Sequence, residues 1–161
     1  MEATRRQATL FLKDSRAVEE VRWKFNPEQA RIIEPHVTLC REDEVADWDK
    51  LAGLIEGGKQ KSVVLCFGIP RREGNFVWLP CEDTSEFDRL RSKLLGASAR
   101  KHVPHLTLVH PRNGICTDEI FDEITAEFQP FTHSFDQIAF IEQKNGGVWK
   151  ILETFGLTKN I

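Results

Sequence analysis

The chain has 161 residues, of which 40% are hydrophobic and 29% charged, and its formal net charge at pH 7 is −3. That length suits one domain, or two small lobes that share a core, and the composition is that of a globular protein. A negative net charge argues against extended duplex nucleic acid as a partner, because non-specific duplex binding needs a broad basic surface. The sequence has no apolar run of the ~18 residues that a membrane span requires, so we expect no membrane partner.

The first half of the chain alternates predicted strands and helices. Its helical spacing is clearest at Val18, Val21 and Phe25, and Ser15 is placed to cap that helix. Gly57 and Gly58 end a second helical pattern. The predicted elements are a strand at 7–13, a helix at 16–25, a strand at 35–41, a helix at about 43–56 and a strand at 61–68.

The second half repeats this order after a loop at residues 69–75 that contains Pro and Gly. Thr117 is a predicted helix cap, and Asn145-Gly146 predicts a hairpin turn. The predicted elements are a strand at 76–80, a helix at 83–95, a strand at 104–110, a helix at 118–128 and hairpin strands at 134–143 and 148–155. We therefore predict an α+β fold with two duplicated lobes, built of small antiparallel sheets with outer helices. Residues 1–161 would form one domain, with pseudo-repeats at about 1–68 and 74–161.

A pentad, Pro-His-aliphatic-Thr-Leu, occurs once in each half, and its histidines, His36 and His105, are 69 residues apart. Residues i and i+2 of a strand point to the same face. His36 therefore shares a face with Thr38, and His105 with Thr107, while the intervening aliphatic residues pack beneath. We expect the two strands to meet at a central groove that holds two imidazoles and two hydroxyls.

This set of groups suits displacement at phosphorus. One neutral imidazole can deprotonate an attacking oxygen while a protonated one supplies the leaving oxygen with its proton. Threonine hydroxyls can donate to the non-bridging phosphate oxygens, where negative charge builds up. This chemistry requires no metal and no other cofactor. A zinc site is a poor interpretation, because the histidines lack the usual close spacing of ligands and have no Cys or acidic partner nearby.

The two motifs, "HVTL" and "HLTL", resemble those of the 2H phosphoesterase superfamily, which includes 2′,5′-RNA ligase-like proteins and cyclic nucleotide phosphodiesterases. The resemblance implies hydrolysis or reversible ligation of 2′,3′-cyclic or 2′,5′-phosphodiester bonds in nucleotides or at RNA ends. It also implies that His36 and His105 are the acid–base pair and that Thr38 and Thr107 bind the phosphate. Of the two histidines, it favours His105 for activating water and His36 for the leaving oxygen.

Two other functions stay open on these residues. One is a nucleotide-binding or RNA-end-binding module without turnover, and the other is a structural domain in which the pentads are relics of duplication. The substrate is also open between cyclic-ended RNA, a 2′,5′-linked oligonucleotide and ADP-ribose cyclic phosphate. We expect a monomer.

The remaining candidate residues have less specific interpretations. His102, His110 and His133 are read as surface or structural, and on an unbroken strand His110 would face away from the groove. Arg71 and Arg72 either clamp a phosphate or are simply solvated. The four cysteines are widely spaced and predict free thiols. Together with an N-terminus that lacks a hydrophobic signal region, they predict a cytoplasmic protein.

Overall fold

Strands and helices alternate along the chain in a computed structural model, which describes residues 3–159. The first half contains β1 (Thr4–Phe11), α1 (Arg16–Phe25), α2 (Pro27–Ile32), β2 (His36–Cys40), α3 (Trp48–Gly57) and β3 (Val63–Phe67). The second half contains β4 (Arg71–Glu73), β5 (Phe76–Pro80), α4 (Ser85–Leu95), β6 (His105–Val109), α5 (Asp118–Ala126) and β7 (Phe131–Phe135). The hairpin strands β8 (Gln137–Lys144) and β9 (Lys150–Gly156) follow.

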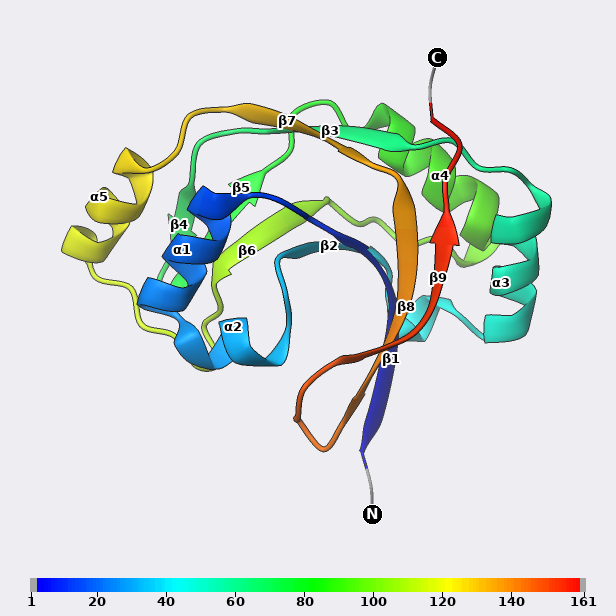
Figure 1. The fold of residues 1–161 in the computed structure, drawn as a ribbon, viewed down its shortest axis with the longest axis horizontal. Coiled ribbons are helices and arrows are strands. Elements are labelled where there is room, and N and C mark those ends of the chain that lie inside the picture. Colours follow the sequence, from blue (N-terminus) through cyan, green and yellow to red (C-terminus); the bar gives the residue numbers. More distant parts are fainter. Residues whose placement is uncertain (1–2, 160–161) are drawn as a thin grey trace.

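These strands form small antiparallel sheets in two lobes. One sheet has the order β2-β1-β8-β9, another has the order β4-β5-β6, and β3 pairs with β7. The two motif strands, β2 and β6, lie beside each other in the middle of the molecule, with α1 and α5 toward one end and α3 and α4 toward the other (Figure 1). The predicted α+β fold with two lobes of small sheets and outer helices is confirmed.

The core lies behind the motif strands and extends through both lobes. Val37 and Leu39 of β2 are fully buried, as are Leu106 of β6 and Leu79 of β5. Burying such a side chain contributes roughly 1.5–3 kcal/mol. Alternation along each strand therefore fixes the motif strands to the core by one face and leaves the His-Thr face outward.

Four local predictions were wrong. Pro27, which occupies the first turn of a helix without loss, starts the unpredicted α2. The helix expected from residue 43 begins at Trp48, where the Asp47 side chain accepts a hydrogen bond from the Lys50 backbone N–H. The predicted strand at 134–143 is divided at Asp136 into β7, which pairs with β3, and β8, which pairs with β1. The loop between the halves includes β4, a three-residue edge strand.

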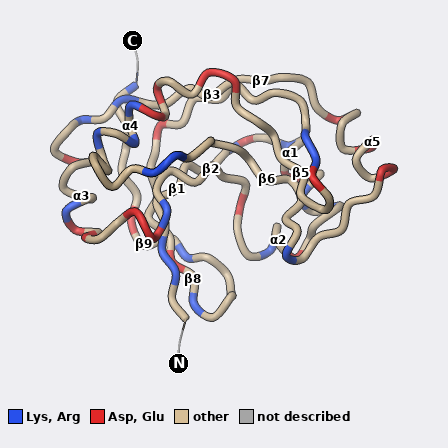
Figure 2. The backbone as a smooth tube through the Cα atoms, turned by 180° about the vertical axis from the view of Figure 1, so that it is seen from behind, with Lys and Arg blue, Asp and Glu red and all other residues tan. Residues whose placement is uncertain are grey.

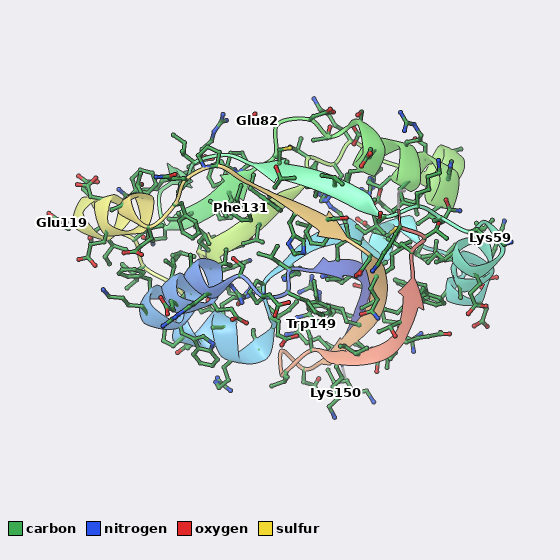
Figure 3. The ribbon with its side chains drawn as sticks, turned by 45° about the horizontal axis from the view of Figure 1, so that its top comes forward. Lys59, Glu82, Glu119, Phe131, Trp149 and Lys150 are labelled. Atoms are coloured by element: carbon green, nitrogen blue, oxygen red, sulfur yellow. The ribbon has the colours of Figure 1, made fainter. Side chains whose placement is uncertain are left out.

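The β8–β9 hairpin forms as predicted. Asn145 and Gly146 have positive φ angles of 50° and 70°, as a tight hairpin turn requires. This hairpin extends the sheet that contains β1 and β2, and Trp149, beside its turn, packs between the hairpin and α2 (Figure 3). No helix within residues 3–159 is long and apolar enough to cross a membrane.

Candidate functional site

The four residues of the two His-x-Thr motifs lie on the outward faces of adjacent strands. His36 and Thr38 on β2 and His105 and Thr107 on β6 are all half-buried, whereas the residues between them are buried. The charge of His105 is among the influences on the pKa of His36, so the two rings lie within electrostatic reach. The structure thus brings together all four residues that the sequence singled out.

Both motif histidines make the same hydrogen bond. The Nδ1 atom of His36 lies 2.9 Å from the carbonyl oxygen of Glu34, and that of His105 lies 3.0 Å from the carbonyl oxygen of Val103. A carbonyl oxygen only accepts, so each Nδ1 carries the hydrogen. In each neutral ring Nε2 then keeps the lone pair, and within residues 3–159 no protein group is hydrogen-bonded to it. Each Nε2 is therefore available to a substrate.

The environment of His36 keeps its ring neutral at pH 7. Burial is the main cause that lowers its pKa to about 4, and the charges of Arg22, His105 and His110 add to the effect. The hydrogen bond to the Glu34 carbonyl opposes the shift. A neutral His36 with its lone pair on Nε2 has the protonation state of a general base.

Aromatic and polar neighbours support the two motifs differently. The Phe11 ring meets the His36 ring edge-on at 6.3 Å, and the Phe76 ring meets the His105 ring edge-on at 5.9 Å. In the first lobe, Gln7 Nε2 donates to the Thr38 hydroxyl at 3.4 Å. The Thr38 hydroxyl hydrogen is then free to point at a phosphate oxygen. Sequence reasoning missed Gln7, whose only signal was its place on the strand before the first motif.

Matching β-bulges follow the two threonines. In the β1–β2 ladder, Thr9 pairs with Thr38 but Ala8 pairs with Cys40, so Leu39 is the extra residue. In the β5–β6 ladder, Trp78 pairs with Thr107 but Val77 pairs with Val109, so Leu108 is the extra residue. Trp78 precedes His105 by the same 27 residues that separate Thr9 from His36. The duplication thus extends to an irregularity that the sequence does not reveal.

The bulges return the fifth residue after each histidine to the groove face. An extra residue shifts the alternation by one, so Arg41 after β2 and His110 after β6 follow two buried residues. The prediction that His110 faces away was wrong for this reason. His110 is half-buried, and its charge is among those that influence His36. Arg41 lines a cavity together with Thr38 and His105.

His102 is a structural histidine that connects the two motifs. Only 9% of the residue is exposed, and its Nε2 lies 2.9 Å from the carbonyl oxygen of Thr38. Its ring is 6.3 Å from the His105 ring, and burial is the main cause that lowers its pKa to about 4. Its buried Nδ1 has no hydrogen-bond partner among the described residues. His102 therefore ties the loop before β6 to the backbone of β2.

A buried ion pair joins the segment that follows β2 to α4. Arg91 of α4 bonds Glu44, with side chains 4% and 0% exposed, and Arg91 also donates to the Leu39 carbonyl of β2. Burial alone would raise the pKa of Glu44, but hydrogen bonds from Arg91 and from the backbone N–H groups of Arg100 and Arg41 lower it to about 2. This pair fixes the end of β2 against α4.

The paired arginines between the halves have different positions. Arg72 donates to the Gly74 carbonyl at 2.7 Å, the Asp118 carboxylate at 2.6 Å and the Cys116 carbonyl at 2.6 Å. Neither a phosphate clamp nor a solvated side chain therefore describes Arg72, which fixes the loop before α5. Arg71 is exposed and lies opposite Trp78 in the β4–β5 ladder. Its role as a phosphate clamp or a solvated side chain stays a prediction.

Within residues 3–159, no three side chains of His, Cys, Asp or Glu are grouped so that they could hold a metal ion. The cysteines are free: Cys40 and Cys116 are buried, and Cys66 and Cys81 are half-buried.

Comparisons with known proteins agree with this description. The family model of the 2′-5′ RNA ligase superfamily matches residues 12–147. A search of curated proteins finds no match. The fold is similar to crystal structures of E. coli LigT. The structure complexed with phosphate has 19% identity and a TM-score of 0.60, and the match covers 98% of this chain and 99% of that one. The structure complexed with 3′-AMP has 18% identity and a TM-score of 0.62, with 96% and 98% covered.

Proposed function

Because this chain belongs to the 2′-5′ RNA ligase superfamily, we propose that it is a phosphodiesterase acting on 2′,3′-cyclic or 2′,5′-phosphodiester bonds of nucleotides or RNA ends. The observation that carries the proposal is the matched pair of half-buried histidines on adjacent strands, each with Nδ1 bonded to a carbonyl two residues earlier. This hydrogen bond fixes the orientation of each ring and leaves its Nε2 atom free to exchange a proton with a reacting oxygen.

The reaction needs one proton acceptor and one proton donor. In hydrolysis, one Nε2 takes the proton of a water whose oxygen forms the new bond to phosphorus. The other, protonated Nε2 gives its proton to the ribose oxygen as the old phosphorus–oxygen bond breaks. Each transfer is worth roughly 10²–10⁴ in rate. The Thr38 and Thr107 hydroxyls donate to the non-bridging oxygens, and ligation is the reverse sequence with a second hydroxyl in place of water.

We assign the base in hydrolysis to His36 and the acid to His105. The lowered pKa of His36, caused mainly by burial, keeps its ring neutral near pH 7, as a base requires. This assignment reverses the roles that the family resemblance favours. The free thiols suit a reducing compartment, so we also propose a cytoplasmic location.

The proposal is tested with purified protein in EDTA, a panel of substrates and separation of the products. The panel contains 2′,3′-cyclic nucleotides, 2′,5′-linked dinucleotides and ADP-ribose cyclic phosphate. We expect turnover of at least one substrate to a single phosphomonoester, its loss in His36→Ala and His105→Ala, and its retention in the matched control His133→Ala. Binding of 3′-AMP without turnover of any substrate would favour the binding module instead. Activity that EDTA removes and zinc or magnesium restores would contradict the mechanism.

A further inference from the structure

We propose that Arg5 and Arg41 form a second phosphate subsite beside Thr38, which binds a phosphate of the substrate other than the one being cleaved. The inference rests on the proposed function and narrows its substrate class. The favoured substrates would carry an additional phosphate, as a 5′-phosphorylated nucleotide or an oligonucleotide does, rather than being nucleoside cyclic phosphates alone.

The first observation is a cavity at the end of the groove. Its volume is about 360 Å³, and it is lined by Arg5, Arg6, Gln7, Thr38, Arg41, Glu42, Asp43, His102 and His105. That volume is at the lower end of the roughly 300–1,000 Å³ typical of ligand pockets. Because Thr38 and His105 belong to the motifs, a substrate held by them would extend directly into this cavity.

Arg41 enters the cavity because of the β-bulge at Leu39. Without the bulge, alternation would direct residue 41 away from Thr38; with it, Cys40 is buried and Arg41 is exposed on the groove side. Arg41 directly follows β2 and lines the cavity together with Thr38. A guanidinium in this position can bind the phosphate next to the scissile one, by two parallel hydrogen bonds.

Arg5 reaches the same cavity from the neighbouring strand. It shares a face of β1 with Gln7, whose amide bonds the Thr38 hydroxyl. Its guanidinium lies 5.5 Å from the centre of the Trp149 ring, and the Trp149 backbone N–H donates to the Ile32 carbonyl at 2.9 Å. A cation–π contact of this kind restricts an exposed arginine without using its hydrogen-bond donors. Arg5 is thus oriented but still able to bind an anion.

The charges around the cavity leave these two arginines available. Arg6 is paired with Glu142 at 2.7 Å, and Asp43 is paired with Arg100. Glu42 is the remaining acidic residue of the lining. Figure 2 shows basic positions along the N-terminal part of β1, although the whole chain carries a net charge of −3. A positive cavity on a negative protein favours local capture of a phosphate over general binding of nucleic acid.

The test compares kcat/KM for three substrates that differ in their additional phosphate. They are adenosine 2′,3′-cyclic phosphate, its 5′-phosphorylated form, and the dinucleotide ApA ending in a 2′,3′-cyclic phosphate. The variants are Arg5→Gln, Arg41→Gln and the double variant. The control is Arg16→Gln, which removes the same charge from an exposed arginine of α1 that is paired with Glu20.

We expect the wild-type protein to prefer one or both phosphorylated substrates by about 10- to 100-fold, the range that charged hydrogen bonds supply. The double variant should lose that preference, Arg41→Lys should keep part of it, and the control should keep all of it. Preference for the 5′-phosphorylated nucleotide alone would show that the subsite binds a phosphomonoester. Preference for the ApA substrate alone would show that it binds an internucleotide phosphodiester. Equal kcat/KM values in the wild type, or a preference that survives in the double variant, would overturn the inference.

A binding experiment separates this inference from the proposed function. If the wild type hydrolyses nothing, the proposed function fails, and calorimetric titration with 3′-AMP and adenosine 3′,5′-bisphosphate still tests the subsite. Tighter binding of the bisphosphate that is lost in the double variant would support it. Equal affinity for the two nucleotides would overturn it.

Discussion

Replacing His102 with Phe should change the sign of its effect on stability between pH 7 and pH 4.5. The substitution keeps an aromatic ring between Phe87 and His105, but it removes the hydrogen bond from Nε2 to the Thr38 carbonyl and removes the titrating group. At pH 7 the Thr38 carbonyl would lose its donor, which costs about 1–3 kcal/mol. Relief of the unpartnered Nδ1 offsets part of that cost, so we expect a net loss near 1 kcal/mol.

At acid pH the wild-type protein loses its stability advantage over His102→Phe. Burial lowers the pKa of His102 from 6.5 to about 4 in the folded protein, so the unfolded chain binds the proton more tightly. The stability contributed by the neutral ring is therefore complete above pH 6.5 and is lost as the pH falls toward 4. The full loss is about 3 kcal/mol, and most of it is reached by pH 4.5. His102→Phe is free of this loss and should be the more stable protein at pH 4.5 by about 1 kcal/mol.

Urea unfolding followed by tryptophan fluorescence measures both values, because the chain contains four Trp residues. The loss due to His36 occurs in both proteins and cancels in the comparison. The control is His133→Phe, which replaces a half-buried histidine of β7. We expect the difference in unfolding free energy between wild type and this variant to depend less on pH. The reasoning about His102 would be refuted by a difference in unfolding free energy between wild type and His102→Phe that is the same at pH 7 and pH 4.5.

Three further predictions concern the groove and its support. Thr38→Val and Thr107→Val should each lower kcat about 10-fold or more without moving the limbs of the pH–rate profile, because a hydroxyl does not titrate in this range. Because burial lowers the pKa of His36 to about 4, log kcat/KM for the wild type should fall on the acid side near pH 4; a fall on the basic side at that pH would reverse the assigned roles. Arg91→Met should cost about 3–5 kcal/mol in urea unfolding by leaving Glu44 buried without its partner, and a cost under about 1 kcal/mol would contradict that explanation.

The sequence predicts the part of the site that follows from alternation along a strand. A repeated Pro-His-aliphatic-Thr pattern states which side chains share a face, and the buried Val37 and Leu106 agree with it. Alternation does not predict the bulges, because Leu39 and Leu108 are ordinary strand residues and no Gly or Pro marks the extra position. The direction predicted for His110 was therefore wrong, and no local pattern in the sequence indicates that Arg41 lies beside Thr38.

Contacts between distant segments account for the other differences. The acidic run 42–44 resembles a helical first turn, but Glu44 is drawn into the buried pair with Arg91, and the helix starts only after Asp47. His102 looked like one more unpaired histidine, since its partner, the Thr38 carbonyl, is 64 residues away. Pairing across such a separation leaves no local pattern in the sequence.

The most direct test of the two-histidine mechanism is kcat/KM for the best substrate of the panel in wild type, His36→Ala, His105→Ala and the double variant. Each single variant should lose roughly 10²–10⁴ of activity, and the double variant should lose little more than the worse single one, because acid and base act as a unit. Circular dichroism should show all four proteins folded, since both rings are half-buried at the surface of the groove. Either single variant with a rate near that of the wild type would contradict the central claim.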